Sequence, residues 1–219
     1  MTLVTNVRSQ LVWQPSLLDA AVAEAGFDPS FAGARHLELD ADAWIEHVPG
    51  WVTGAGELFD TIVNTAEWSQ RRVRMYDRMV DEPRLHAWYE LPLDHTFPLP
   101  VVPEMARALS ERYDRAFDGV GTALYRDGRD SVAWHGDRIP EEIHDPVVAL
   151  VSLGSPRTLR MRAKFRRRDT RSFPLLPGDL FVMGGASQRT WEHSVPKVAR
   201  AGPRLSLQFR HSANATVPV

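Results

Sequence analysis

From Gly121 to the C-terminus, the sequence is a series of short β-strand patterns separated by turn signals. Apolar residues in these segments recur with the period of two that is typical of strands. The turn signals include Asp127-Gly128, Pro177-Gly178 and Gly184-Gly185. Many short strands divided by such turns predict a β-sandwich or jelly roll. The expected strands cover residues 122–126, 147–153, 158–165, 179–183 and 204–211.

The first half of the chain carries mainly helical patterns. Apolar residues at helical spacing predict a helix over 17–25 that ends at Gly26, and further helices over 40–48 and 58–63. Pro103 fits the first turn of another helix. We therefore expect an α+β fold in a single domain over residues 1–219, with a mainly helical support over 1–118 and a catalytic β core over 119–213.

Composition excludes several classes of protein. The 219 residues contain no cysteine, which rules out disulfide frameworks, thiolate zinc sites and iron–sulfur clusters. The formal net charge of -2 argues against a globally basic nucleic-acid-coating protein, although it allows a local basic face. The sequence shows neither an N-terminal leader pattern nor an apolar run of ~18 residues. We expect a cytoplasmic monomer without membrane contact.

Two histidines and a carboxylate follow one another in an order that suits a metal. His135 and Asp137 are two residues apart, so on an extended segment both side chains point to the same side. His193 follows the strand expected at 179–183. Such a triad leaves open positions for substrate and oxygen on Fe(II), although the same ligands also hold hydrolytic zinc.

A pair of arginines distinguishes these alternatives. Arg204, Ser206 and Arg210 fall on one face of a strand over 204–210. Arginine is suited to bidentate carboxylate binding, and a dicarboxylate such as 2-oxoglutarate needs cations beside the metal. Taken alone, this pattern would be interpreted as a basic edge strand that faces solvent. Because the strand follows the His135, Asp137 and His193 triad in the sequence, the pattern favours an iron oxygenase over a zinc hydrolase.

With these motifs in order, the chain resembles the AlkB group of Fe(II)- and 2-oxoglutarate-dependent dioxygenases, which remove alkyl lesions from nucleic-acid bases. The resemblance is carried by Tyr125-Arg126-Asp127-Gly128, His135-Gly136-Asp137, the segments 176–185 and 191–197, and the strand over 204–210. It implies a double-stranded β-helix, or jelly roll, braced by N-terminal helices. It further implies that iron is bound by His135, Asp137 and His193, and that 2-oxoglutarate is bound by Tyr125, Arg204, Ser206 and Arg210.

The sequence departs from the family pattern at three positions. Ala123 and Ser206 stand where the family usually has asparagine, and each change removes a side-chain amide from the cosubstrate pocket. Ile139 stands where an acidic residue often reads the exocyclic amine of the base. Because of the first two departures, one alternative stays open: a metal-stabilised nucleic-acid-binding protein that has lost a functional cosubstrate pocket and has no turnover. The third leaves base selectivity open.

The substrate surface is predicted from basic and aromatic residues. The segment 157–171 holds eight cations and a single acid, and we interpret it as a phosphate-binding face that includes Arg166 and Arg167. Trp68, Arg72 and Tyr76 resemble the family's nucleotide-recognition lid, with Trp68 as the surface on which a flipped base stacks. The alternatives are solvated hairpin faces for the cations and a core position for Trp68.

Taken together, the sequence predicts oxidative dealkylation of N-alkylated bases in DNA, or in RNA, with Fe(II), 2-oxoglutarate and O2. The products would be succinate, CO2 and an aldehyde. The same oxygenase chemistry on tRNA, a protein side chain or a small molecule stays open as an alternative.

Overall fold

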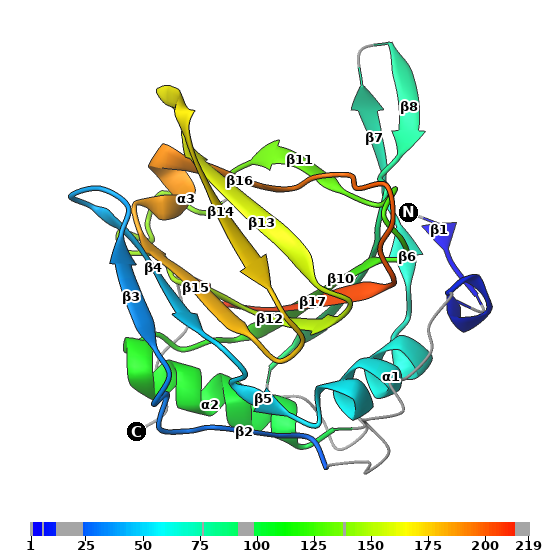
Figure 1. The fold of residues 1–219 in the computed structure, drawn as a ribbon, viewed down its shortest axis with the longest axis horizontal. Helices are drawn as coiled ribbons and strands as arrows, with labels where there is room; N and C mark the ends of the chain where they lie inside the picture. Colours follow the sequence, from blue (N-terminus) through cyan, green and yellow to red (C-terminus); the bar gives the residue numbers. More distant parts are fainter. Residues whose placement is uncertain are drawn as a thin grey trace.

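The computed structural model describes residues 2–5, 7–11, 24–75, 77–91, 99–137 and 139–212. Its described strands pair antiparallel, and two of the sheets face each other in a jelly roll (Figure 1). The nine-stranded sheet has the order β1 (Thr2–Leu3), β6 (Ser69–Gln70), β9 (Leu85–Glu90), β10 (Gly119–Tyr125), β17 (Arg204–Arg210), β12 (Val148–Gly154), β15 (Leu180–Gly185), β4 (Ala43–Val48) and β3 (Arg35–Glu38).

The second sheet is smaller and carries the two predicted histidine ligands on neighbouring strands. Its order is β11 (Val132–His135), β16 (Trp191–Val195), β13 (Arg157–Ala163) and β14 (Arg166–Leu175). Two further pairs are β2 (Gly26–Phe27) with β5 (Val52–Thr53), and β7 (Arg72–Met75) with β8 (Arg78–Asp81). The β7–β8 hairpin and the β13–β14 hairpin both project from the body of the molecule, on either side of β11 (Figure 1).

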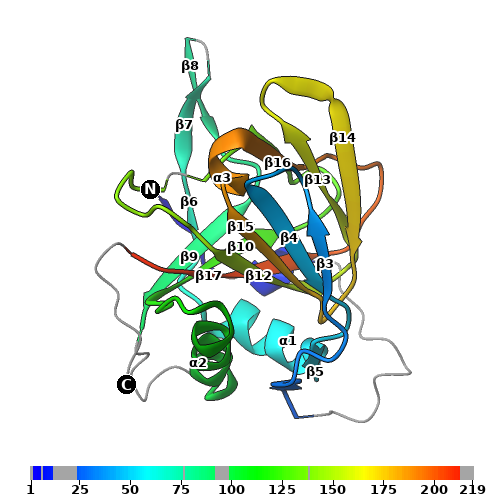
Figure 2. The same cartoon turned by 90° about the vertical axis from the view of Figure 1, so that its left-hand side faces the viewer.

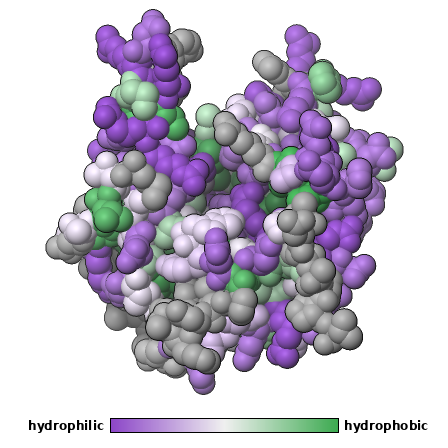
Figure 3. Space-filling model, turned by 180° about the vertical axis from the view of Figure 1, so that it is seen from behind, coloured by the Kyte–Doolittle hydropathy of each residue, from purple (hydrophilic) through white to green (hydrophobic). Residues whose placement is uncertain are grey.

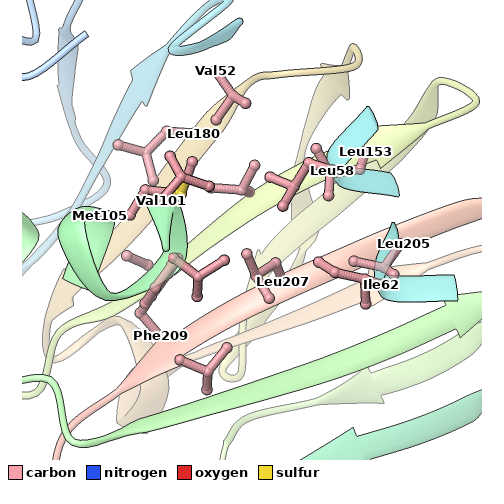
Figure 4. Close-up of a cluster of buried hydrophobic side chains, with 14 of the residues drawn as sticks. Val52, Leu58, Ile62, Val101, Met105, Leu153, Leu180, Leu205, Leu207 and Phe209 are labelled. Atoms are coloured by element: carbon pink, nitrogen blue, oxygen red, sulfur yellow. The ribbon is translucent and has the colours of Figure 1, made fainter. Parts of the chain in front are cut away.

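Two helices brace the outer face of the large sheet, as Figure 2 shows. They are α1 (Ala55–Thr65) and α2 (Val101–Tyr113); a short α3 (Ser187–Thr190) and a 3-10 turn, η1 (Val7–Gln10), complete the described helical elements. The apolar face of α1 packs on the sheet through Leu58 and Ile62, which meet Leu205 and Leu207 of β17 (Figure 4). Each such buried side chain contributes about 1.5–3 kcal/mol. None of the helices in the described ranges has the length and apolar character to cross a membrane.

A second apolar cluster lies between the two sheets. Ile45, Ala123 and Phe181 from the large sheet meet Met161 and Trp191 from the small one. This inner cluster fills one side of the space between the sheets. Tyr125 of β10 belongs to the same cluster, and Arg204 and Ser206 of β17, which pair with Tyr125 and Ala123, point into the same space because residues two apart on a strand share a face.

The strand and jelly-roll predictions are confirmed. The segments expected at 122–126, 147–153, 158–165, 179–183 and 204–211 correspond to β10, β12, β13, β15 and β17 within a few residues. The helices expected around 58–63 and after Pro103 are α1 and α2. Most of the helix expected over 17–25 lies outside the described residues, and Gly26 opens β2 instead of ending a helix.

The helix predicted over 40–48 is wrong, because this segment forms a turn and β4. Asp40 accepts hydrogen bonds from the backbone N–H groups of Asp42 and Ala43, and so closes the turn between β3 and β4. The strand lies between β15 and β3 and is covered on both faces, so its apolar pattern is not strictly alternating. With β1 to β9 all before residue 91, the mainly helical description of 1–118 is also wrong.

Candidate iron and 2-oxoglutarate site

The three predicted metal ligands converge at one end of the small sheet. β11 and β16 pair antiparallel with His135 directly opposite His193, and Asp137 follows two residues after the first histidine. One ligand atom from each residue lies within 4.8 Å of the other two, and the imidazole centroids are 4.2 Å apart. The donor set is two imidazoles and one carboxylate, which is the facial triad of non-haem Fe(II) sites.

The hydrogen bond of one imidazole and the burial of the other suit metal binding. Nδ1 of His135 lies 2.8 Å from the carbonyl oxygen of Ala133, and a hydrogen bond there places the proton on Nδ1 and leaves Nε2 free. Burial lowers the pKa of His193 to about 4, so this ring is neutral at neutral pH. A neutral imidazole is the form that coordinates metal ions.

The Asp137 carboxylate lacks a hydrogen-bond partner on one oxygen. Its Oδ2 is buried without an aligned donor, although Nη1 of Arg210 lies 3.0 Å away as an ion pair. Burial by itself raises the pKa of Asp137, but the positive charge of Arg210 prevails, so the pKa is lowered and the group stays ionised. Buried carboxylate oxygens in native proteins are normally paired. A metal ion held with the two histidines would satisfy this oxygen, and the residues therefore fit one.

A second polar site lies between β10 and β17, where Tyr125 pairs with Arg204. Arg204 is 1% exposed, its Nε donates to Oγ of Ser152 at 3.1 Å, and burial lowers its pKa. Arg84 donates to the hydroxyl of Tyr125 at 3.2 Å, and the Arg157 guanidinium lies 5.7 Å from the Tyr125 ring centroid. No acidic side chain of the described residues pairs with Arg204, so this pocket concentrates positive charge that suits a carboxylate.

The other predicted cosubstrate residues line the same face of β17. Ser206 is buried and faces Ala123 of β10, and Nε2 of Gln208 lies 3.4 Å from its hydroxyl. Arg210 lies six residues beyond Arg204, about 20 Å along the strand. The two arginines therefore lie at different ends of the strand: Arg204 is buried, and Arg210 lies beside Asp137.

Comparison with known proteins identifies the family. The 2OG-Fe(II) oxygenase superfamily matches residues 52–210, which include the triad and both arginines. The chain belongs to this superfamily. The jelly roll and the candidate metal ligands agree with that assignment.

Relatives of known name place the chain near the AlkB group of the superfamily. It is 32% identical over 182 residues to the human protein named alpha-ketoglutarate-dependent dioxygenase alkB homolog 3, and 33% identical to the mouse protein of that name. In both cases the match covers 74% of this chain and 64% of the relative. The chain is also 28% identical to the human DNA oxidative demethylase ALKBH2, over 71% of this chain and 68% of the relative. The predicted AlkB-like character is confirmed.

The structure corrects the interpretation of Trp68. This side chain is 3% exposed, packs in the main core, and donates from Nε1 to the carbonyl oxygen of Val63 at 3.0 Å. It therefore occupies the core position that was the alternative, and no base can reach it. Arg72 lies exposed on β7 and pairs with Asp81 at 3.4 Å. Tyr76 lies outside the described residues.

An exposed tryptophan that sequence reasoning missed faces the site. Trp88 on β9 is 54% exposed and points to the same face of the large sheet as Gln208 and Arg210. Its ring lies over Gly119 and Gly121, where an added Cβ would come within 2.5 Å and 3.1 Å of ring carbons. The two glycines, at alternate positions of β10, have no side chains, so the ring can pack flat against the strand. That spacing is the one sequence signal that could have pointed to Trp88.

The basic segment 157–171 contributes less positive surface than its composition suggests. Arg157 is buried and donates to the carbonyl oxygens of Asp127, Asp130 and Pro196, so its assignment to a phosphate-binding face is wrong. Arg162 pairs with Glu192 at 2.9 Å. The side chains that stay exposed, without an ion pair to another described residue, belong to Arg160, Arg166 and Arg168. The side chain of Arg167 lies outside what the structure describes.

Proposed function

We propose that this protein removes alkyl groups from N-alkylated bases in DNA or RNA by Fe(II)- and 2-oxoglutarate-dependent oxidation. The observation that carries the proposal is a facial triad in contact with Arg210, on the same strand as the buried Arg204, which has no acidic partner among the described residues. The names of the similar proteins, alkB homolog 3 and DNA oxidative demethylase, support a nucleic-acid substrate. The chain spans about two thirds of their length, and the activity of those whole proteins is inferred for it.

Each part of the site has a role in this reaction. His135, Asp137 and His193 would hold Fe(II). Arg204 and Tyr125 would bind the distal carboxylate of 2-oxoglutarate, and Ser206 and Arg210 would bind along the rest of it. Bound Fe(II) supplies the oxidising chemistry, in which 2-oxoglutarate and O2 yield succinate and CO2 while an N–CH3 group becomes N–H and formaldehyde.

The protein side chains prepare this site before any substrate arrives. The buried guanidinium of Arg204 offers its donors in a water-poor pocket, where a carboxylate is bound more strongly than at the surface. The hydrogen bond from His135 to Ala133 fixes the ring that faces the metal position. The Trp88 ring offers a flat surface at the open side of the same face, where an extruded base can stack.

The test is 2-oxoglutarate turnover with defined substrates. We would measure succinate formation with Fe(II) alone, with an unmodified oligonucleotide, and with oligonucleotides bearing single N-methylated bases. The proposal predicts stimulation by a methylated oligonucleotide together with formaldehyde release. Asp137→Ala serves as the matched control, and it should abolish both products. Turnover without stimulation by any nucleic acid would assign the oxidation to another substrate, and absence of turnover would favour a binding protein.

A further inference from the structure

The hairpin between β13 and β14 starts beside the metal ligands. Met161 of β13 pairs directly with His193, so the strand leaves the site and reaches the hairpin within four residues. Lys164 then donates from Nζ to the carbonyl oxygen of Arg189 at 2.5 Å. A Cβ on Gly136, the residue between the two ligands of the first motif, would lie 3.4 Å from that Nζ. The turn of the hairpin is therefore held against the metal-binding segment at Lys164.

An aromatic side chain stands unpacked at the tip of this hairpin. Phe165 is 93% exposed, the highest value among the large apolar residues of the described chain. It lies in the two-residue turn with Lys164, and Arg166 follows it. A phenyl ring that is exposed to water contributes no hydrophobic burial to the stability of the fold. Its placement calls for a partner with apolar faces.

The charge around Phe165 defines that partner. Arg166 and Arg168 are exposed, and no acidic side chain of the described ranges pairs with either. Together with Lys164 and Phe165 they line a shallow, open hollow at the surface. Nucleic acid combines phosphates for these cations with flat base faces for the ring. A second copy of the chain would instead bring the same cations against each other.

We propose that Phe165 stacks on a base next to the alkylated nucleotide, while Arg166 and Arg168 contact the phosphates of that strand. This inference rests on the proposed function for the identity of the substrate. The β13–β14 and β7–β8 hairpins form two largely hydrophilic protrusions with a hollow between them (Figure 3). A strand whose alkylated base enters between these protrusions would pass the hairpin tip with its neighbouring bases.

The test separates stacking from simple apolar contact. We would measure the affinity for a fluorescein-labelled, unmodified single-stranded oligonucleotide by anisotropy, at one fixed salt concentration, for Phe165→Ala, Phe165→Leu and Phe165→Tyr. The control is Leu176→Ala, which removes another exposed apolar side chain just beyond the far end of β14. Turnover is measured in parallel on a methylated mononucleotide, which has no neighbouring base, and on a methylated oligonucleotide.

Stacking predicts a graded result. Phe165→Ala should raise the dissociation constant about 5- to 150-fold, the range of one base–aromatic contact, and Phe165→Leu should recover little of it. Phe165→Tyr and Leu176→Ala should bind like the wild type, and mononucleotide turnover should be unchanged in all four. Arg166→Gln should reduce the slope of log affinity against log salt by about 1.

Failures of the two proposals look different. Wild-type oligonucleotide affinity in Phe165→Ala, or full affinity in Phe165→Leu, overturns the stacking role while leaving demethylation standing. Oligonucleotide binding that depends on Phe165, without demethylation of any substrate, overturns the function and keeps the contact. If the wild-type protein binds no oligonucleotide at all, both the contact and the nucleic-acid substrate are wrong.

Discussion

Replacing Arg204 by Met should make the unliganded protein more stable and nearly abolish its affinity for 2-oxoglutarate. In the free protein the guanidinium is 1% exposed, donates to Ser152, and has no acidic partner among the described residues. Replacing buried ionic groups by apolar side chains of similar size stabilises proteins by about 1–4 kcal/mol. The lost hydrogen bond offsets about 1 kcal/mol of this gain.

The effect on the cosubstrate has the opposite sign. Removing the partner of a desolvated carboxylate costs about 2–5 kcal/mol, which raises the dissociation constant for 2-oxoglutarate about 30- to 5,000-fold. At a concentration of 100 wild-type dissociation constants, 2-oxoglutarate should stabilise the wild type by about 2.7 kcal/mol, and at the same concentration it should stabilise the variant by about 0.9 kcal/mol or less. Urea unfolding with and without 2-oxoglutarate, under anaerobic conditions with Fe(II), measures both quantities, and calorimetric titration gives the affinity.

Arg157→Met is the matched control for loss of a buried arginine. Arg157 donates three hydrogen bonds to backbone carbonyl groups, so its removal leaves buried acceptors unpaired and should destabilise the protein. If Arg204→Met destabilised the free protein as much as Arg157→Met and kept the wild-type affinity for 2-oxoglutarate, the argument for an uncompensated buried charge would be refuted.

Three further predictions concern the ligands, the tryptophans and pH. Alanine at His135, Asp137 or His193 should greatly weaken Fe(II) binding in a metal titration and abolish succinate formation. Near-normal Fe(II) binding by one of these variants would remove that residue from the site. Trp68→Ala should lower the free energy of unfolding by about 3–5 kcal/mol, because this side chain is buried in the core. Trp88→Ala should leave the free energy of unfolding unchanged and reduce oligonucleotide demethylation about ten- to a hundredfold. The reverse pattern would exchange the roles of the two tryptophans. Burial, and then the charge of Arg84, lowers the pKa of His86 to about 4 from 6.5, so below pH 6.5 the unfolded chain takes up the proton first. Stability should therefore fall by about 2 kcal/mol between pH 7 and pH 5 through this group, and His86→Gln should lose less over that interval in urea unfolding; an identical loss would show that His86 does not contribute.

The sequence by itself predicted the candidate metal ligands and the fold class. Residues two apart on a strand share a face whatever else surrounds them, so His135 with Asp137, and Arg204 with Ser206, could be placed together from spacing alone. The helix at 58–63 was equally local, since its apolar residues lie on one side at helical spacing. These features depend on short-range geometry that each segment carries within itself.

Only the tertiary structure decided how the same residue types divide between core and surface. Trp68 is buried by core residues that are distant in the sequence. Trp88 stays exposed to solvent because the two glycines of β10 beneath its ring contact only one of its faces. Arg157 and Arg166 lie in one basic segment, yet one is buried among carbonyl oxygens and the other faces solvent. Burial depends on which strands pack around a residue. Residues 43–48 form a strand because they pair with β15, which lies 130 or more positions away in the sequence. Long-range pairing of this kind leaves no periodic signal in the segment that receives it.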